Sequence, residues 1–173
     1  FSKIKQVQIV ACGTSYNAGL VAKYWLEDIA KIPCNVEVAS EYRYRHPIIL
    51  DDTLFVTLSQ SGETADTVEA LKAAKKINSN TIFLCITNSP ESSLTRLCDL
   101  TFLTHAGPEI GVASTKAFTT QLVALALLTC SIGSLKKSIN KKQEKGIVSG
   151  LKLLPGLVNE ALLQETQIKN LAS

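Results

Sequence analysis

The stretch Ser59-Gln60-Ser61-Gly62-Glu63-Thr64 gathers hydroxyl and amide side chains around a single glycine. An apolar, β-rich run precedes it at 53–58, and apolar residues recur at helical spacing after it, over 65–77. The stretch is therefore predicted to be a loop between a strand and a helix. Because a helix N-terminus has unpaired N–H groups and about half a positive charge, it favours anions. These residues predict a phosphate-binding loop built from dipoles and hydroxyl groups, without a lysine.

The same stretch also fits an ordinary helix cap. In that interpretation Ser61 or Gly62 is the N-cap, and Glu63 in the first turn complements the helix dipole. Glu63 is accordingly expected to be a dipole partner and not a general base. The two interpretations are compatible, since one loop can cap a helix and hold an anion.

Apolar runs alternate with segments of helical periodicity along most of the chain. Continuous apolar runs predict five strands, at 6–11, 35–39, 53–58, 81–87 and 100–103. Helices are predicted at 17–30, 40–45, 65–77, 92–97, 116–131 and 147–163, with Gly133 ending the long one and Pro155 interrupting the last. This alternation predicts an α/β fold, a five-stranded parallel sheet flanked by helices on both faces.

Loops that follow strands are the expected ligand-binding segments of such a sheet. Ligands bind beyond the carboxyl ends of parallel strands, at a topological switch point. The segments that contain Gly13, Ser59 and Gly111 all lie at or near predicted strand ends. We therefore expect the three segments to converge on one pocket.

Composition limits the classes of function. The chain has 173 residues, enough for one domain with a sizeable core, and its formal charge of +3 is too small to indicate nucleic-acid binding. No signal peptide is visible, and the longest apolar run, 122–130, is too short to span a bilayer. Five cysteines without a C-x-x-C pair indicate buried free thiols and a reducing, cytoplasmic location. With only two histidines, no metal site or cofactor is expected.

Three motifs carry a resemblance to a known family. They are 11–17 (ACGTSYN), 59–67 (SQSGETADT) and 109–121 (EIGVASTKAFTTQ). Together, and in this order, they resemble the first sugar-isomerase (SIS) domain of glutamine–fructose-6-phosphate aminotransferases. The resemblance covers roughly 6–134 and implies a SIS-type fold, a flavodoxin-like three-layer sandwich.

The resemblance also implies a substrate site for fructose 6-phosphate or glucosamine 6-phosphate. The phosphate would be held by the residues that match the family's loop, namely Ser59, Gln60, Ser61 and Thr64. Ser15 matches a position that contacts the sugar, and Val112 and Ser114 match positions beside it. Gly13 and Thr14 match positions whose backbone lies near the reacting carbons.

A domain division follows from the resemblance. Residues 1–134 would be the SIS domain, and 135–173 a basic connector and C-terminal helix that lead toward a second SIS domain. The family's glutaminase domain, and the second half that carries its catalytic Glu, Lys and His, have no match here. No catalytic residue is therefore expected in this stretch, which begins at Phe1 without any Met and reads as part of a longer protein. Its apolar long helix and amphipathic tail favour a homodimer.

Some roles stay open at this stage. Glu109 could orient a ligand hydroxyl or cap the helix that follows it, and Lys116 could lie near the anion or in solvent. His105 and the cluster 42–45 (YRYR) are expected to be surface features. Two other functions share the same motifs: a phosphosugar sensor without catalysis, and another phosphosugar isomerase.

Overall fold

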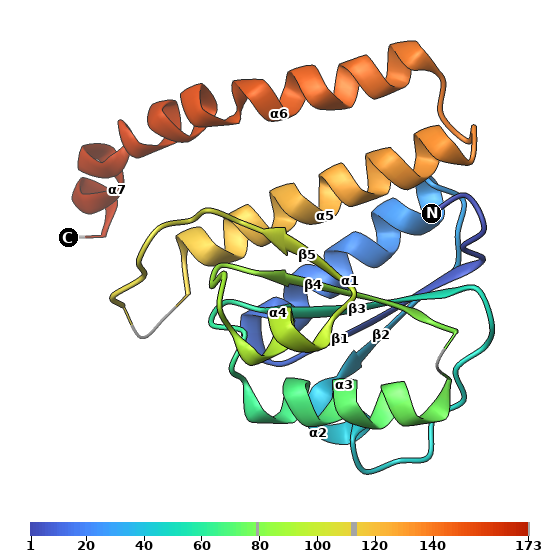
Figure 1. The fold of residues 1–173 in the computed structure, drawn as a ribbon. Helices are drawn as coiled ribbons and strands as arrows, with labels where there is room; N and C mark the ends of the chain where they lie inside the picture. Colours follow the sequence, from blue (N-terminus) through green and yellow to red (C-terminus); the bar gives the residue numbers. More distant parts are fainter. Residues whose placement is uncertain (79, 112–113, 173) are drawn as a thin grey trace. The chain divides into compact units, whose positions relative to one another are not determined.

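The computed structural model describes residues 1–78, 80–111 and 114–172, and the chain divides into two compact units, 1–139 and 140–173. The first unit contains a five-stranded, all-parallel sheet in the order β2-β1-β3-β4-β5 (Figure 1). Its strands are β1 (Gln6–Ala11), β2 (Cys34–Val38), β3 (Thr53–Ser59), β4 (Ile82–Thr87) and β5 (Leu100–Leu103). The predicted α/β architecture is confirmed.

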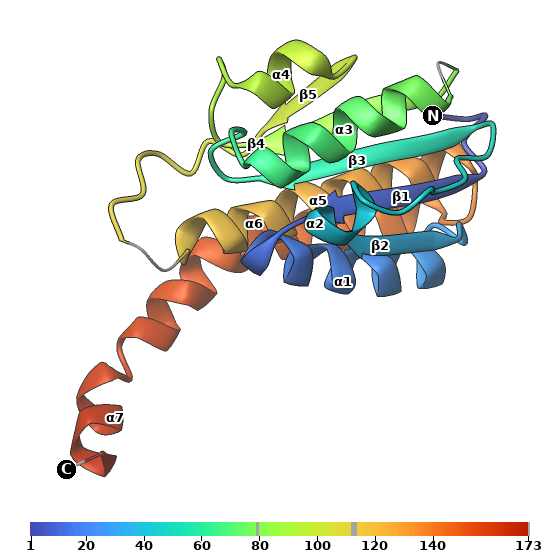
Figure 2. The same cartoon turned by 90° about the horizontal axis from the view of Figure 1, so that it is seen from below.

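Helices cover both faces of this sheet, as Figure 2 shows. One face packs against α1 (Gly13–Asp28) and α5 (Lys116–Leu135), whose buried side chains join a core with β1, β3 and β4. The other face packs against α2 (Ala39–Tyr42), α3 (Ala65–Ile77) and α4 (Ser93–Leu97). All seven residues of β3 are buried, because this strand lies at the centre of the sheet and has helices above and below it.

The strand order places a topological switch point beside the predicted phosphate loop. From β1 the chain goes to β2 on one side, and it then crosses back to β3 on the other side of β1. Ala11 at the end of β1 is paired in register with Leu58 near the end of β3. The segments that follow these two strands therefore leave the same sheet edge next to each other, where α/β sheets bind ligands.

Two helices of the first unit differ from their predicted bounds. The helix expected to begin at Asn17 begins at Gly13, because the first turn of a helix needs no N–H partners and tolerates glycine and hydroxyl residues. The long helix passes through Gly133 and ends at Leu135. The helix terminates there because Lys137 takes the left-handed conformation, with φ of 59°.

The second unit is helical and also corrects the sequence-based expectation. The helix α6 (Lys141–Leu162) begins within the segment predicted to be a connector, because Asn140 and Gln143 form a reciprocal capping box. Pro155 lies inside α6, and the helix continues through it, although an interior proline removes a backbone hydrogen bond and costs about 3 kcal/mol. A short helix, α7 (Glu165–Leu171), follows.

Among the described helices, only α5 is by itself long and apolar enough to cross a bilayer. Helices α6 and α7 reach that length and hydropathy only when the two are counted together as one bent span. In the structure α5 packs on α1 and on the sheet, and Gln121 and Thr129 are among its buried residues. Core helices of globular proteins meet the same length and composition criteria. We therefore assign α5 to the core of the first unit.

Candidate functional site

The phosphate loop joins β3 to α3 and turns sharply at Gly62. Gly62 has φ of +68°, in the left-handed region that favours glycine. A Cβ at this position would lie 2.1 Å from the Ser92 hydroxyl oxygen. The backbone N–H of Leu94 donates to the Gly62 carbonyl at 3.1 Å. The loop therefore rests directly on the N-terminus of α4, and only glycine fits at the contact.

The hydroxyl groups of the loop leave protons free for an anion. The Gly62 N–H donates to Ser59 Oγ at 3.0 Å, and Ser59 Oγ and Thr64 Oγ1 share one hydrogen bond of 2.9 Å. Either hydroxyl can be the donor in this bond. Ser59 is only 2% exposed and Thr64 is half-buried, so when Ser59 donates, the Thr64 proton is left for an incoming anion. Ser61 is exposed and accepts from the Glu63 N–H at 3.1 Å, which leaves its proton free as well.

The N-cap of α3 lies further along than predicted. Thr64 is the N-cap and Ala65 the first helical residue, so neither Ser61 nor Gly62 caps this helix and Glu63 lies before its first turn. The backbone N–H groups of 65–67 have no acceptor inside the helix, as in every helix first turn. These amides and the two free hydroxyl protons lie at one helix start, which has the donor chemistry of an anion site.

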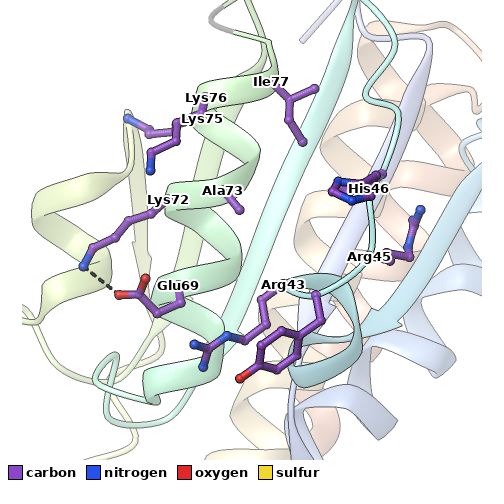
Figure 3. A pocket seen from close by; sticks show the side chains of 11 residues that line it. Arg43, Arg45, His46, Glu69, Lys72, Ala73, Lys75, Lys76 and Ile77 are labelled. Carbon is purple, nitrogen blue, oxygen red and sulfur yellow. Dashed lines mark hydrogen bonds and ion pairs between the residues drawn. The ribbon is translucent and has the colours of Figure 1, made fainter.

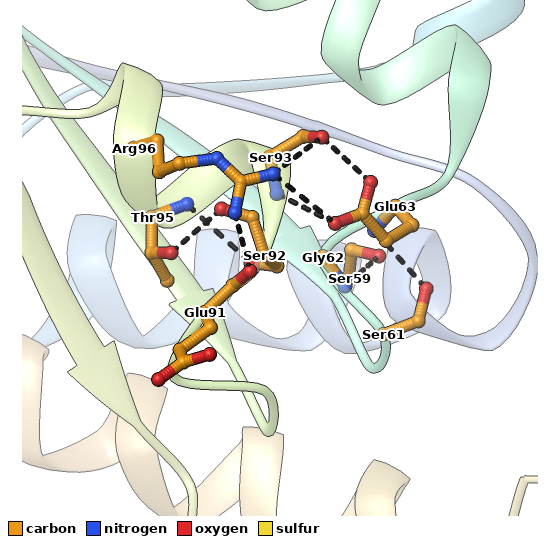
Figure 4. A network of polar contacts seen from close by, with 9 residues as sticks. All are labelled: Ser59, Ser61, Gly62, Glu63, Glu91, Ser92, Ser93, Thr95 and Arg96. Carbon is orange, nitrogen blue, oxygen red and sulfur yellow. Dashed lines mark hydrogen bonds and ion pairs between the residues drawn. The ribbon is translucent and has the colours of Figure 1, made fainter.

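Glu63 caps a different helix, α4, as Figure 4 shows. Its carboxylate accepts from the Ser93 N–H at 2.7 Å and from the Ser93 hydroxyl at 2.6 Å, and Arg96 lies 4.0 Å away. The Ser93 hydroxyl, then its backbone N–H, hold the pKa of Glu63 below its ordinary value. Glu63 therefore does interact with a helix N-terminus as predicted, but the helix is α4 and not α3. The contact turns the carboxylate toward α4 and pairs its charge there.

Gln60 connects the loop to a neighbouring hollow. Its carbonyl accepts from the Asn88 N–H at 3.0 Å and from Thr87 Oγ1 at 3.3 Å. Its side-chain amide makes no hydrogen bond within the part of the chain that the structure describes. Gln60 lines a hollow of about 430 Å³ together with His105 and residues of the loops after β4 and β5, which are Asn88, Ser89, Pro90, Gly107 and Pro108. His105, expected to be a plain surface residue, therefore shares a hollow with the phosphate loop.

The first motif lies at the start of α1. Gly13 and Thr14 are exposed in its first turn, and Gly13 has φ of +57°. Ser15 is buried, and the Gln121 side chain of α5 donates to its hydroxyl at 3.0 Å. This bond joins residues that lie more than a hundred positions apart, one from the first motif and one from the third.

The third motif is placed only in part. Val112 lies outside the described residues, and Ser114 is half-buried just before α5. Glu109 Oε1 accepts from the N–H groups of Thr115 at 2.8 Å and Ala117 at 3.4 Å, so Glu109 caps α5. This answers the question that the sequence left open. Lys116 lies near the hollow, since a Cβ on Gly107 would be 4.0 Å from its Nζ.

A larger hollow, of about 650 Å³, lies away from this loop between α3 and the segment that follows α2 (Figure 3). Basic side chains line it, but most of them are already paired. Arg43 binds Asp66 at 2.7 Å, Arg45 binds Glu37, and Lys72 binds Glu69 at 2.8 Å. Tyr42 is buried in the core. The cluster 42–45 is therefore a packed and charge-balanced surface.

Within the described residues, neither the cysteines nor the other potential metal ligands form a candidate metal site. None of the five cysteines forms a disulfide bond, and Cys34, Cys85 and Cys130 are buried. Burial raises the pKa of Cys34 to about 12. Among residues 1–78, 80–111 and 114–172, no group of three or more His, Cys, Asp or Glu side chains could hold a metal ion.

Two features of the site escaped the sequence-based reasoning. The contact of Glu63 with Ser93, and that of Gln60 with Asn88, join the phosphate loop to loops about 30 residues away. Asn88-Ser89-Pro90 directly follows a predicted strand, so its position marked it as part of the ligand edge of the sheet. No local pattern indicated its hydrogen-bond partners.

We predict that Gly62→Ala destabilises the domain and weakens anion binding together. The new methyl group meets Ser92 at far less than contact distance, and the left-handed backbone disfavours alanine. The loss in unfolding free energy should be about 1–3 kcal/mol by urea denaturation. The matched control is Gly146→Ala in α6, where a Cβ meets nothing and helix propensity favours alanine. Equal stability of the Gly62 variant and wild type would contradict the packing described.

The Glu63–Ser93 contact should make the free energy of unfolding depend on pH. A carboxyl whose pKa is lowered in the folded state stabilises it above the unfolded pKa, and this stabilisation disappears as the pH falls through the folded value. The melting temperature of wild type should therefore exceed that of Glu63→Gln at pH 7, and the gap should close as the pH falls below the ordinary value of 4.5. Glu160→Gln, on exposed α6, is the control. A gap that stays constant down to pH 2 would show that the Glu63 charge is not responsible.

Comparison with known proteins extends these observations. The SIS domain family model matches residues 1–131. The chain is 58% identical, over 99% of its length, to a glutamine–fructose-6-phosphate aminotransferase [isomerizing] of Pseudomonas syringae pv. tomato, and it spans 28% of that relative. A solved C-terminal domain of glucosamine-fructose-6-phosphate aminotransferase from Francisella tularensis is 55% identical, with a TM-score of 0.94 over 98% of this chain and 48% of that one.

A more distant solved structure shares the fold. Glucosamine-6-phosphate deaminase from Thermotoga maritima is 27% identical, with a TM-score of 0.70 over 84% of this chain and 44% of that one. The family model covers residues 1–131, which include the whole five-stranded parallel sheet. The chain belongs to the SIS domain family.

Proposed function

We propose that this chain is the sugar-phosphate-binding part of an aminotransferase that converts fructose 6-phosphate and glutamine to glucosamine 6-phosphate and glutamate. The observation that carries the proposal is a preformed anion site on a domain that is 58% identical to a relative of that name. The match covers 99% of this chain, so it includes the proposed phosphate loop, the Ser15 region and Glu109.

The binding chemistry follows from the loop. A phosphate dianion would accept from the Ser61 and Thr64 hydroxyl groups and from the first amides of α3. Each charge-assisted hydrogen bond of this kind contributes about 1.5–3 kcal/mol. Ser59 is buried beneath Thr64 and orients it, and Gln60 offers its free side-chain amide from the adjoining hollow. Ser15 is proposed to contact the sugar with Ser114 beside it, and the backbone of Gly13 and Thr14 is proposed to lie near the reacting carbons. Val112 matches a further position beside the sugar and lies outside the described residues.

The remaining steps of the reaction belong to other parts of the proposed enzyme. The chain spans 28% of the length of the curated relative, and none of its residues is proposed as catalytic. A glutaminase domain and a second SIS domain are the proposed partners within the longer protein, with residues 1–134 as the first SIS domain and 135–173 as the connection onward. This chain alone would bind the phosphosugar without converting it.

Two further properties form part of the proposal. We infer a homodimer, because α6 and α7 carry many exposed apolar side chains, among them Leu153, Leu157, Leu162 and Leu171, and apolar patches of this kind are typical of interfaces. We also infer a cytoplasmic location, because none of the five cysteines forms a disulfide bond and reducing compartments keep thiols reduced. No cofactor is proposed.

The binding of phosphosugar to this loop can be tested directly. Fructose 6-phosphate should bind the chain and fructose should not, because the loop recognises the phosphate. Ser61→Ala or Thr64→Ala removes one free donor, so each should weaken binding about 10- to 100-fold without unfolding the domain. Affinity should also fall as the pH drops below about 6, where the phosphate becomes a monoanion.

Isothermal titration calorimetry of wild type and the two variants at pH 7.5 and pH 5 measures these effects. Ser149→Ala on the exposed face of α6 is the control and should bind as wild type does. Equal binding of fructose and fructose 6-phosphate, or undiminished binding by both variants, would show that the loop is only a structural turn.

A further inference from the structure

Two cysteines from different elements lie together on one face of the sheet. Cys85 is buried in β4, and Cys98 is the half-buried C-cap of α4. The Cys98 Sγ atom lies 3.8 Å from Thr57 Oγ1 of β3. Because Thr57 and Cys85 are register partners on neighbouring parallel strands, their side chains point to the same face of the sheet. A sulfur that reaches Thr57 from α4 therefore lies beside the Cys85 thiol.

Hydrogen bonds favour the thiolate form of Cys85. Its Sγ lies 3.3 Å from Thr101 Oγ1 of β5, and the Cys98 thiol is its other partner. The bond from Cys98, and then that from Thr101, lower the pKa of Cys85 to about 7 although the side chain is buried. The pKa of Cys98 is raised in turn, because its proton is held by Cys85 and its own side chain is partly buried. One thiolate next to one thiol is the arrangement of redox-sensing cysteine pairs.

Helix α4 joins this pair to the phosphate loop. The Cys98 N–H donates to the Leu94 carbonyl at 2.9 Å, and the Leu94 N–H donates to the Gly62 carbonyl at 3.1 Å. At the same end of the helix Ser93 donates to Glu63, as Figure 4 shows. A displacement of Cys98 is therefore transmitted to the loop through one short helix.

We propose that Cys85 and Cys98 form a reversible disulfide when the protein meets hydrogen peroxide, and that this bond displaces α4 and weakens anion binding by the phosphate loop. The first part stands on the two thiols, and the second part rests on the proposed function. Disulfides in reducing compartments are usually transient and redox-sensing, which agrees with the cytoplasmic location inferred above. Cys98 is the half-buried member, so peroxide reaches the pair from its side.

The oxidation needs hydrogen peroxide as its only co-reactant. The Cys85 thiolate attacks one peroxide oxygen and the O–O bond breaks, which gives a sulfenic acid on Cys85 and a hydroxide that takes up the proton Cys85 had released. The Cys98 sulfur then attacks the Cys85 sulfur, the S–O bond breaks, and the departing hydroxide leaves as water with the Cys98 proton. Two thiols and one peroxide thus give one disulfide and two waters. A dithiol reductant reverses the change by exchange.

The disulfide moves α4 more than β4. Its two sulfurs lie about 2.05 Å apart, so the Cys98 sulfur must approach Cys85. The strand β4 lies between β3 and β5, and five of its six residues are buried, whereas α4 is a helix of only five residues. The displaced helix loses its hydrogen bond to the Gly62 carbonyl. A loop that is less ordered beforehand then binds phosphate more weakly.

Peptide mapping of the full chain after peroxide treatment tests the disulfide. Trypsin cleaves after Arg96 and places the two cysteines in the peptides 77–96 and 97–116, each with a single cysteine. We expect these peptides to be joined after oxidation and separated again by dithiothreitol. The thiol count of the denatured chain should fall by two from the five of the reduced chain.

The half-buried Cys12, the N-cap of α1, is the internal control. Its exposure is similar to that of Cys98, so a disulfide that forms by exposure alone would include it. Peptides joined through Cys12, or a thiol count that stays at five, overturn the inference. This measurement uses wild type and needs no variant.

Calorimetric titration of the reduced and the oxidised chain with inorganic phosphate tests the link to the loop. Oxidised wild type should bind about three- to tenfold more weakly, the loss expected for one hydrogen bond, and dithiothreitol should restore the affinity. Cys98→Ser cannot form the disulfide, so peroxide should leave its affinity unchanged.

The outcomes separate this inference from the proposed function. Reduced wild type that binds no phosphate overturns the proposed function and the second part of the inference, while the peptide map still decides the first part. Equal affinities of oxidised and reduced wild type, or an equal loss in peroxide-treated Cys98→Ser, overturn the link between the cysteine pair and the loop alone.

Discussion

The close approach of Gly62 to Ser92 is the contact on which the binding edge of this domain depends. A backbone turn with a positive φ packs against Ser92, the N-cap of α4, with no space for a side chain. Glu63 then reaches Ser93, the Leu94 N–H reaches the Gly62 carbonyl, and the loop is fixed at the start of α3 before any ligand arrives. Because the donors are already ordered, a phosphate loses less affinity to ordering the loop when it binds.

The proposed anion site has no cation inside the loop itself. Hydroxyl groups and helix amides are neutral, so their attraction to phosphate depends on orientation and on the helix dipole. Arg96 is engaged with Glu63 and α4, and the basic side chains beside α3 are largely paired. The specificity therefore comes from donor geometry and not from net charge.

The sequence predicted this arrangement where local patterns decide it. Helix α3 has the predicted bounds, because its apolar spacing is helical throughout, although its N-cap is Thr64 and not Ser61 or Gly62. Strands β1 and β5 also have their predicted bounds. The end of α5 at Leu135, followed by the left-handed Lys137, was missed because the turn geometry there is not visible in the periodicity. The continuation of α6 through Pro155 was also missed. The partners of Glu63 and Asn88 could not be predicted, since these contacts join loops that only the folded sheet brings together. Periodicity identifies strands and helices, but not which loop side chains meet across a sheet edge.

The most direct test of the preformed phosphate site is a titration of the ¹⁵N-labelled chain with inorganic phosphate, followed by amide chemical shifts. The account predicts saturable shifts confined to 60–67 and the adjoining residues after β4, with little change in the basic hollow beside α3 or in α6. Shifts that cluster instead around Arg43, His46 and Lys76, or no saturable shift in 60–67, would contradict it.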